Sequence, residues 1–327
     1  MRMWFRPVKG IAFCIVAAFF GSQAMAQVQV KRSFPSAKRI SAFDNTTFCT
    51  AFLSDGSLLT IRDIPIVDLR DVDKIAFNPT GSSLALMRGK KPVSIYSFRD
   101  RNKKLFELKE QRKSKELKGR KNLNFFVPGP VGAELMKDAS KGDIVPVAMC
   151  YGADARNFLV SNSLGEIIVY DTKAYLPQAY IQGKAVATAI TMSPNNYFIA
   201  AGTGKNIDIW NFQTKELRTS LPMPAEVTEL VFSADASQMA VVTADKRLTI
   251  FDTKTWDKVD IFDKIGGTLT SPSFHPDGKY ISVVKDGNAI VIMNLKNSVP
   301  EQTLDENPGG VTGSRFFVNK QTSDVFM

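Results

Sequence analysis

The sequence predicts an all-β protein, and three observations lead to that fold class. Five segments share one pattern: an apolar run, a turn, a second apolar run, a polar turn and a third run. From Gly152 to His275, successive copies of the first turn lie 41, 40 and 42 residues apart. The apolar runs are short and rich in β-branched residues, which favours buried strands. A period of about 40 residues, with three visible strands and room for a fourth, predicts four-stranded blades of a β-propeller.

The spacing inside the segments is as regular as the spacing between them. The segments are 75–97, 149–171, 190–211, 230–252 and 272–294. In four of them, 18 residues separate the first turn residue from a large residue near the end of the third run, and in the remaining one 17 do. The pairs are Asn78 and Tyr96, Gly152 and Tyr170, Ser233 and Phe251, His275 and Met293, and, at 17, Ser193 and Trp210.

The first turns have residue types that explain their conformation. Asn78-Pro79-Thr80-Gly81 and His275-Pro276-Asp277-Gly278 begin with a side chain that can bond back to the backbone, place proline second and end on glycine. Proline presets φ at the second position, and glycine tolerates the last. We therefore predict a structural role for these turn residues, namely Pro79, Gly81, Pro194, His275, Pro276, Asp277 and Gly278.

The pattern resembles the WD-repeat propellers, in their degenerate bacterial and exported form, over roughly residues 36–325. The resemblance rests on the first turn and on the third run, which ends in a large residue followed by Asp or Asn. These pairs are Tyr170-Asp171, Trp210-Asn211, Phe251-Asp252 and Met293-Asn294. The chain departs from the eukaryotic pattern because it contains a single histidine, so the Gly-His pair of those blades is missing.

The number of blades has two readings. Residues 45–63 indicate a second strand, a turn and a third strand, and 314–327 indicate a first strand, a turn and the start of a second. If strand 314–318 completes the blade begun at 45–70, the ring has six blades. If 37–43 already supplies that first strand, 314–327 begins a seventh. We predict six or seven blades.

One segment does not follow the repeat. Residues 99–121 contain eleven Lys or Arg and four Asp or Glu, so they account for most of the net charge of +10. We read 99–145 as an outer strand followed by a basic insertion. It is either an electrostatic binding arm or a solvated charged segment. The candidate partner-binding residues are Lys103, Lys104, Arg112, Lys113, Lys115, Lys118, Arg120, Lys121, Phe125 and Phe126.

The first 26 residues predict a cleaved signal peptide. Basic residues precede the apolar run 11–20, and Ala24 and Ala26 form a small-residue cleavage site before Gln27. We therefore expect an exported protein, periplasmic or secreted, whose domain spans 27–327 and has no membrane span after cleavage. Cys49 and Cys150 remain in it; they either pair or stay as buried free thiols.

The sequence offers little for catalysis. His275 occupies a position that holds Asn, Gly or Ser in the other copies, so a turn role is favoured over a general base. One histidine and two scattered cysteines exclude a Cys/His zinc site. Catalysis by acidic channel residues stays open; Asp154, Asp235 and Asp277 are candidates, but they lie in turns.

The function that these observations favour is a non-catalytic platform in the bacterial envelope. We expect it to be a monomeric ring that binds a protein or an anionic envelope component, without a cofactor, a metal or nucleic acid. The alternative is a propeller hydrolase or lyase that acts on a glycan or a lactone through acidic residues of the central channel.

Overall fold

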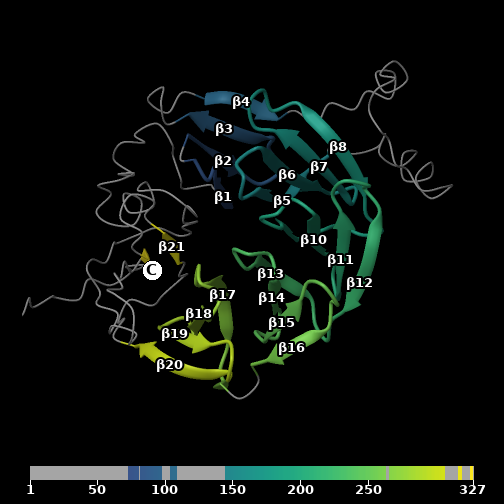
Figure 1. Ribbon diagram of the computed structural model, residues 1–327. Coiled ribbons are helices and arrows are strands. Elements are labelled where there is room, and N and C mark those ends of the chain that lie inside the picture. The colour runs from purple at the N-terminus through teal and green to yellow at the C-terminus, as the bar shows by residue number, and fades with distance from the viewer. Residues whose placement is uncertain are drawn as a thin grey trace, which may run out of the picture. The chain divides into compact units, whose positions relative to one another are not determined.

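A computed structural model describes residues 73–80, 82–97, 104–108, 144–262, 265–305, 316–318 and 325–326 of the chain. They form five four-stranded antiparallel sheets and a two-stranded hairpin, and none of them lies in an α-helix (Figure 1). Within each four-stranded sheet the strands are neighbours in chain order. The predicted fold class, an all-β β-propeller, is therefore confirmed, and each four-stranded sheet is one blade.

The strands are short and of similar length. The first sheet contains β1 (Lys74–Phe77), β2 (Ser83–Met87), β3 (Val93–Ser97) and β4 (Lys104–Leu108). The second contains β5 (Pro146–Tyr151), β6 (Asn157–Asn162), β7 (Glu166–Asp171) and β8 (Pro177–Gln182). The third contains β9 (Ala189–Met192), β10 (Phe198–Gly202), β11 (Asn206–Asn211) and β12 (Leu217–Pro222). The fourth contains β13 (Val227–Phe232), β14 (Gln238–Thr243), β15 (Leu248–Asp252) and β16 (Lys258–Ile261). The fifth contains β17 (Leu269–Phe274), β18 (Tyr280–Lys285), β19 (Ala289–Asn294) and β20 (Val299–Leu304).

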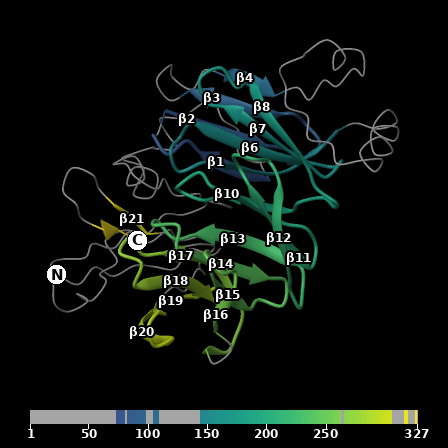
Figure 2. The same ribbon diagram turned by 45° about the vertical axis from the view of Figure 1, so that its right-hand side comes forward.

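The chain divides into two compact units. One unit is Pro65–Phe232; its described part holds the first three sheets and β13 (Figure 2). The other is Met1–Ile64 with Ser233–Met327, and its described part holds β14 to β20 and the hairpin.

The five predicted segments coincide with the first three strands of the five sheets. Second strands are buried along almost their whole length, as in β2 and β6, so an apolar run stands at the centre of each. Fourth strands are edge strands that alternate between half-buried and exposed residues, most regularly in β12. Their weak apolar signal explains why the sequence indicates an outer strand in 99–145 but otherwise only room for a fourth strand.

A β-bulge lies between the third and fourth strands of every four-stranded sheet. The register shifts at the large residue that the sequence repeat marks, that is, at Tyr96, Tyr170, Trp210, Phe251 and Met293. A bulge inserts an unpaired residue and increases the local twist of the strand. The regular spacing in the sequence therefore measures the distance from the first turn to this bulge.

Each sheet has two different ends. The "turn end" of a sheet is the end that carries the connection from the first to the second strand and the connection from the third to the fourth strand. The "loop end" is the opposite end, which carries the connection from the second to the third strand and the link to the next sheet. This antiparallel order decides which polar residues can meet.

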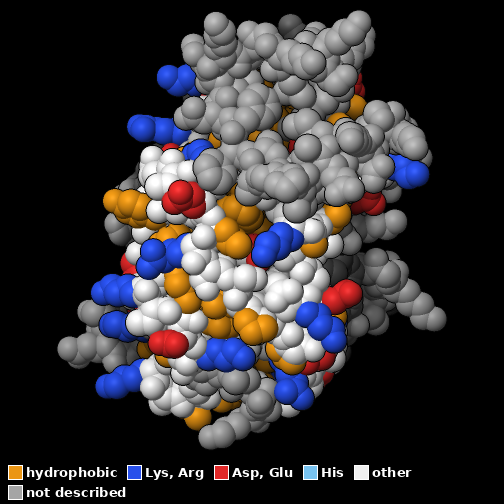
Figure 3. Space-filling view, turned by 90° about the vertical axis from the view of Figure 1, so that its right-hand side faces the viewer, with side chains coloured by type: hydrophobic (Ala, Val, Ile, Leu, Met, Phe, Trp, Pro, Cys, Tyr) orange, Lys and Arg blue, Asp and Glu red, His pale blue; other side chains and the backbone are white. Residues whose placement is uncertain are grey.

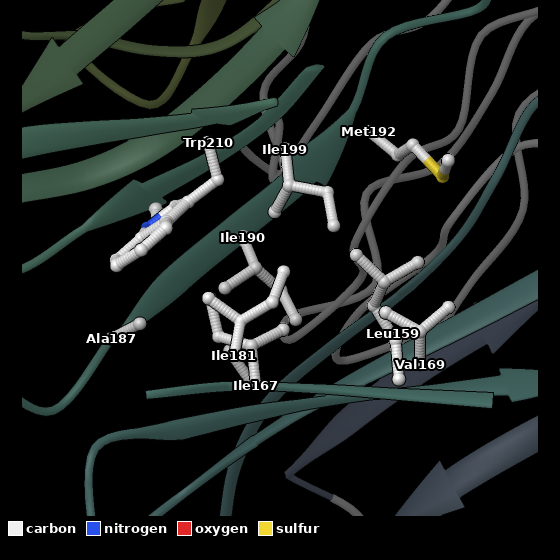
Figure 4. Packing of buried hydrophobic residues seen from close by; sticks show 12 residues of the cluster. Leu159, Ile167, Val169, Ile181, Ala187, Ile190, Met192, Ile199 and Trp210 are labelled. Atoms are coloured by element: carbon white, nitrogen blue, oxygen red, sulfur yellow. The ribbon is translucent and has the colours of Figure 1, made fainter. Parts of the chain in front are cut away.

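Apolar clusters pack the sheets of the unit 65–232 together. One joins the second and third sheets: Leu159, Ile167 and Val169 lie against Ile190 and Ile199 (Figure 4). A second cluster joins the first and second sheets around Ile95 and Phe158, which are fully buried. Each such side chain contributes about 1.5–3 kcal/mol by leaving water. In the other unit, Val241, Val242, Ile281 and Val283 are equally inaccessible.

The end of the chain has the two strands that the sequence predicts there. β21 (Phe317–Val318) pairs with β22 (Val325–Phe326) in an antiparallel hairpin. Residues 37–70, on which the two readings of the blade number depend, lie outside the described residues, so six and seven blades both stay predictions. The predicted signal peptide, 1–26, also lies outside them. Within the described ranges, no helix has the length and apolar character needed to cross a membrane.

Candidate functional site

The turn between the first and second strands repeats the same hydrogen bonds in sheets two to five. The N–H of its first residue donates to the C=O five residues later, at 2.8–2.9 Å, and the fourth N–H donates to the first C=O at 2.9 Å. The fourth residue has a left-handed φ of 59° to 71°. Glycine occupies it only at Gly278; the other turns place Ala155, Asn196 and Ala236 there. A left-handed non-glycine residue costs roughly 1–2 kcal/mol, which the surrounding hydrogen bonds must offset.

His275 belongs to this hydrogen-bonding scheme. Its Nδ1 lies 2.7 Å from Asp277 Oδ1, and the N–H of Asp277 donates to Nδ1 at 3.2 Å. Ser193 and Ser233 hold the equivalent position, and their hydroxyls donate to Asn195 and Asp235 at 2.7 and 2.6 Å. The imidazole also packs edgewise on Phe316, with ring centroids 4.9 Å apart. The histidine thus has the place and the contacts of a turn residue.

The carboxylates considered for catalysis are turn caps as well. Asp154, Asp235 and Asp277 each accept the backbone N–H two residues later, at 2.8–3.0 Å. Partial burial raises the pKa of Asp235, but the Ser233 hydroxyl and the Ser237 N–H outweigh it, so the net pKa is lowered. All three carboxylates serve as hydrogen-bond acceptors, and the lowered pKa of Asp235 keeps that carboxyl ionised at neutral pH.

The remaining predicted turn residues fall in the same turns. Pro79 follows β1, and Pro194 and Pro276 take the second turn position in the third and fifth sheets. Gly81 lies outside the described residues.

The Asp or Asn after each large residue caps the turn between the third and fourth strands. Asp171 accepts the N–H groups of Lys173, Ala174 and Leu176 at 2.8–3.0 Å. Asn211 and Asp252 each accept two N–H groups in the same way. The N–H groups of Thr255 and Lys254 lower the pKa of Asp252. The aromatic-plus-Asp/Asn pattern therefore combines a bulge with a cap.

A buried hydroxyl cluster joins the first two sheets, and sequence reasoning missed it. Tyr175 OH lies 3.1 Å from Ser83 Oγ and 2.9 Å from Tyr151 OH. Burial raises the pKa of both tyrosines. Phe106 of β4 packs on the Tyr175 ring at 5.1 Å. No sequence pattern indicated this cluster; the structure places Tyr175 in a turn with a left-handed φ of 52°.

Lys74 is a second residue that the sequence did not single out. It starts β1 at the loop end, and its Nζ donates to Val147 O at 2.9 Å and to Thr188 O at 3.2 Å. One ammonium group thus joins the first strands of the first two sheets and the connection that leads into the third sheet.

The structure places only the start of the basic segment. Lys104 lies in β4, where its Nζ contacts Glu107 Oε1 at 2.5 Å, so this lysine belongs to an edge strand. The other candidates, namely Lys103, Arg112, Lys113, Lys115, Lys118, Arg120, Lys121, Phe125 and Phe126, lie outside the described residues.

Cys150 is a free thiol, and Cys49 lies outside the described residues. Burial raises the pKa of the Cys150 thiol to about 12, against the opposing effect of a backbone hydrogen bond from Met192. Among the residues that the structure describes, no three His, Cys, Asp or Glu side chains come together as metal ligands.

The sheets define the class of protein, a β-propeller, and the capped turns fit a WD-like form of it. No family model matches the chain. Among curated proteins, it is similar to the Periodic tryptophan protein 2 homolog of Dictyostelium discoideum, with 29% identity over 132 residues. That match covers 34% of this chain and 14% of the relative, so the chain spans a small part of the relative's length. This distant WD-repeat protein fits the class that the sheets define.

Proposed function

We propose that the protein is a non-catalytic platform that binds another protein. The observation that carries the proposal is the repeated WD-like blade, whose polar turn residues are engaged in holding the turns. Asp154, Asp235 and Asp277 accept hydrogen bonds from their own backbone. A rigid framework with short exposed connections is suited to hold several binding contacts in fixed positions.

The basic segment is the distinguishing contact of the proposed platform. Its cations would attract an acidic surface and raise the association rate at low salt. Because β4 ends at Leu108, removing residues 103–121 would also remove an edge strand. The test therefore substitutes Gln for the candidate binding cations that follow β4, namely Arg112, Lys113, Lys115, Lys118, Arg120 and Lys121.

Partners are captured from an extract of the native host on tagged wild-type and Gln-substituted protein. We expect the wild-type partner to be lost from the substituted protein and retained on a control with Gln at Lys173, Lys254 and Lys296, three exposed turn lysines. Equal capture by both variants would reject the basic segment as the binding arm.

The proposed location is the bacterial envelope, on the evidence of residues 1–26. The mature protein should then begin at Gln27 and fractionate outside the cytoplasm. N-terminal sequencing of the protein from its native host, with fractionation of the cells, tests this; an intact Met1 in the cytoplasm would reject it.

The alternative of a hydrolase or lyase has less support. Its candidate carboxylates are those of the first turns, which already accept backbone N–H groups. Loss of hydrolysis of a glycan or lactone on replacing Asp235 by Asn, with unchanged folding, would revive the alternative.

A further inference from the structure

The loop end of the unit 65–232 carries more cations than acids. It has six cationic and three acidic side chains in its described residues. The cations are Lys74, Arg88, Lys90, Lys91, Lys184 and Lys205, and the acids are Asp73, Glu166 and Glu226. The turn end of the second and third sheets has three of each, namely Arg156, Lys173 and Lys215 with Asp154, Asp171 and Glu216.

Hydrogen bonds show that the loop ends of the three sheets are close together. Lys74 reaches from the first sheet to Val147 of the second and to Thr188, just before the third. Thr188 N–H bonds to Gly202 O in the third sheet, at 3.0 Å. Gly183 N–H bonds to Gly165 O at 2.9 Å, which joins the two connections of the second sheet. The cations therefore lie at adjoining ends of the three sheets.

Four of these cations are available to a partner. Lys90, Lys91, Lys184 and Lys205 are exposed, and within the described ranges none of them forms an ion pair. Two of the three acids have roles in the fold: Asp73 accepts the N–H of Gly89, and buried Glu166 accepts from Asn162 Nδ2 at 2.7 Å. The surface field at the loop end is consequently positive.

Apolar side chains stand among these lysines. Val186, between Lys184 and the third sheet, is 36% exposed, and Leu164 of the neighbouring connection is half-buried. Elsewhere on the molecule, the space-filling view also shows protruding Lys and Arg with hydrophobic side chains between them (Figure 3). A surface that alternates cations with apolar groups matches a polypeptide that carries both carboxylates and apolar side chains.

We propose that this loop end binds an acidic polypeptide segment with interspersed apolar side chains. The inference rests on the proposed platform function, but it uses a different set of residues from the basic segment. The two are nevertheless joined: β4 ends at Leu108 and β5 begins at Pro146, both at the loop end. An acidic partner held by the lysines would therefore meet the place where the basic segment leaves the sheets.

The test measures binding of a fluorescein-labelled peptide of alternating Glu and Leu by fluorescence anisotropy. The variant carries Glu at Lys90, Lys91, Lys184 and Lys205. The control carries Glu at Arg156, Lys173, Lys254 and Lys296, so the change in net charge is the same, but the substitutions lie at turn ends. We expect the dissociation constant to rise at least about tenfold for the variant and less than about twofold for the control.

Equal weakening in variant and control would overturn the proposal, because it would show a general effect of net charge. Binding of wild-type protein to anionic phospholipid vesicles, with no binding to the peptide, would overturn it in favour of a membrane surface. Thermal unfolding checks that each protein is folded, and the milder pair Lys184→Gln and Lys205→Gln replaces the variant if it is not. Peptide binding is also measured on the protein whose basic segment carries the Gln substitutions. If that protein still binds the peptide, the loop-end proposal holds even where the proposed binding arm fails.

Discussion

The two ends of the sheets use their charged side chains differently. At the turn end, Asp154 and Asp171 are bonded to backbone N–H groups, and Asn211 fills the place of an acid without a charge. At the loop end, Lys90, Lys184 and Lys205 are exposed and form no ion pair among the described residues. Acidic side chains thus hold the turns at one end, whereas exposed lysines outnumber exposed acids at the loop end of the unit 65–232.

This difference predicts which substitutions should lower the free energy of unfolding. Removing a cap that accepts several N–H groups leaves these donors without their protein acceptor, and this lowers the free energy of unfolding. A lysine without a partner can be removed at almost no cost. The following experiments test that contrast, beginning with the packing that both ends share.

The largest loss of stability is expected for Phe158→Ala. The ring is fully buried and lies 4.5 Å from the ring of Tyr151. Its removal leaves a cavity between the first two sheets and should cost about 3–5 kcal/mol in urea unfolding. Phe158→Leu is the control and should lose less. A loss below about 1 kcal/mol for the alanine variant would contradict this packing.

The next effect is expected at the turn end. Asp171→Ala removes the acceptor of three backbone N–H groups. It should lower the free energy of unfolding by about 1–2 kcal/mol. Asp171→Asn keeps one acceptor oxygen, as Asn211 does naturally, and should recover most of the loss. If the two variants are equally stable, the capping role is wrong.

Acid should weaken the turn end at low pH. The pKa values of Asp235 and Asp252 are lowered from 3.8, so their stabilisation is complete above 3.8 and is lost as the pH falls through the lowered values. The thermal midpoint should therefore fall below about pH 4. The thermal midpoint of the Asp235→Asn variant should fall less over the same pH range, because residue 235 then has no carboxylate to protonate. If the thermal midpoints of wild type and variant fell in parallel, groups other than Asp235 would cause the acid sensitivity.

The smallest effect is expected at the loop end. Lys184→Ala and Lys205→Ala should each change the free energy of unfolding by less than about 0.5 kcal/mol. The same variants should bind the acidic peptide more weakly than wild type. If these lysine variants lost as much free energy of unfolding as Asp171→Ala, the proposed difference between the turn end and the loop end would be wrong.

Much of the fold follows from the sequence because its regularity is local. The turn from His275 to Gly278 and the buried runs on either side repeat at fixed spacing, so strands one to three of each described sheet could be predicted. Apart from the outer strand placed in 99–145, the fourth strands could not be located, because an edge strand such as β12 buries only every second residue partially. The Asp of Phe251-Asp252 was recognised as part of a pattern, but its role as a cap depends on a turn geometry that composition does not specify.

The candidate site was less predictable because it depends on contacts between sheets. Lys74 looks like any exposed lysine in the sequence, and its two carbonyl partners lie 73 and 114 residues away. Tyr175 likewise meets Ser83 across 92 residues. No local pattern encodes such pairs. The loop-end lysines were overlooked for the same reason: each is ordinary alone, and only the sheet topology gathers them.

The contacts of Lys74 also set an order of events in folding. The first sheet can complete its local hydrogen bonds by itself, but its ammonium group finds both carbonyls only after the second sheet has formed and the chain has reached Thr188. During synthesis, the Lys74 side chain therefore makes its contact with Thr188 only after 114 further residues have been added. A single side chain at the beginning of β1 thus ties the first sheet to the second sheet and to the connection that leads into the third.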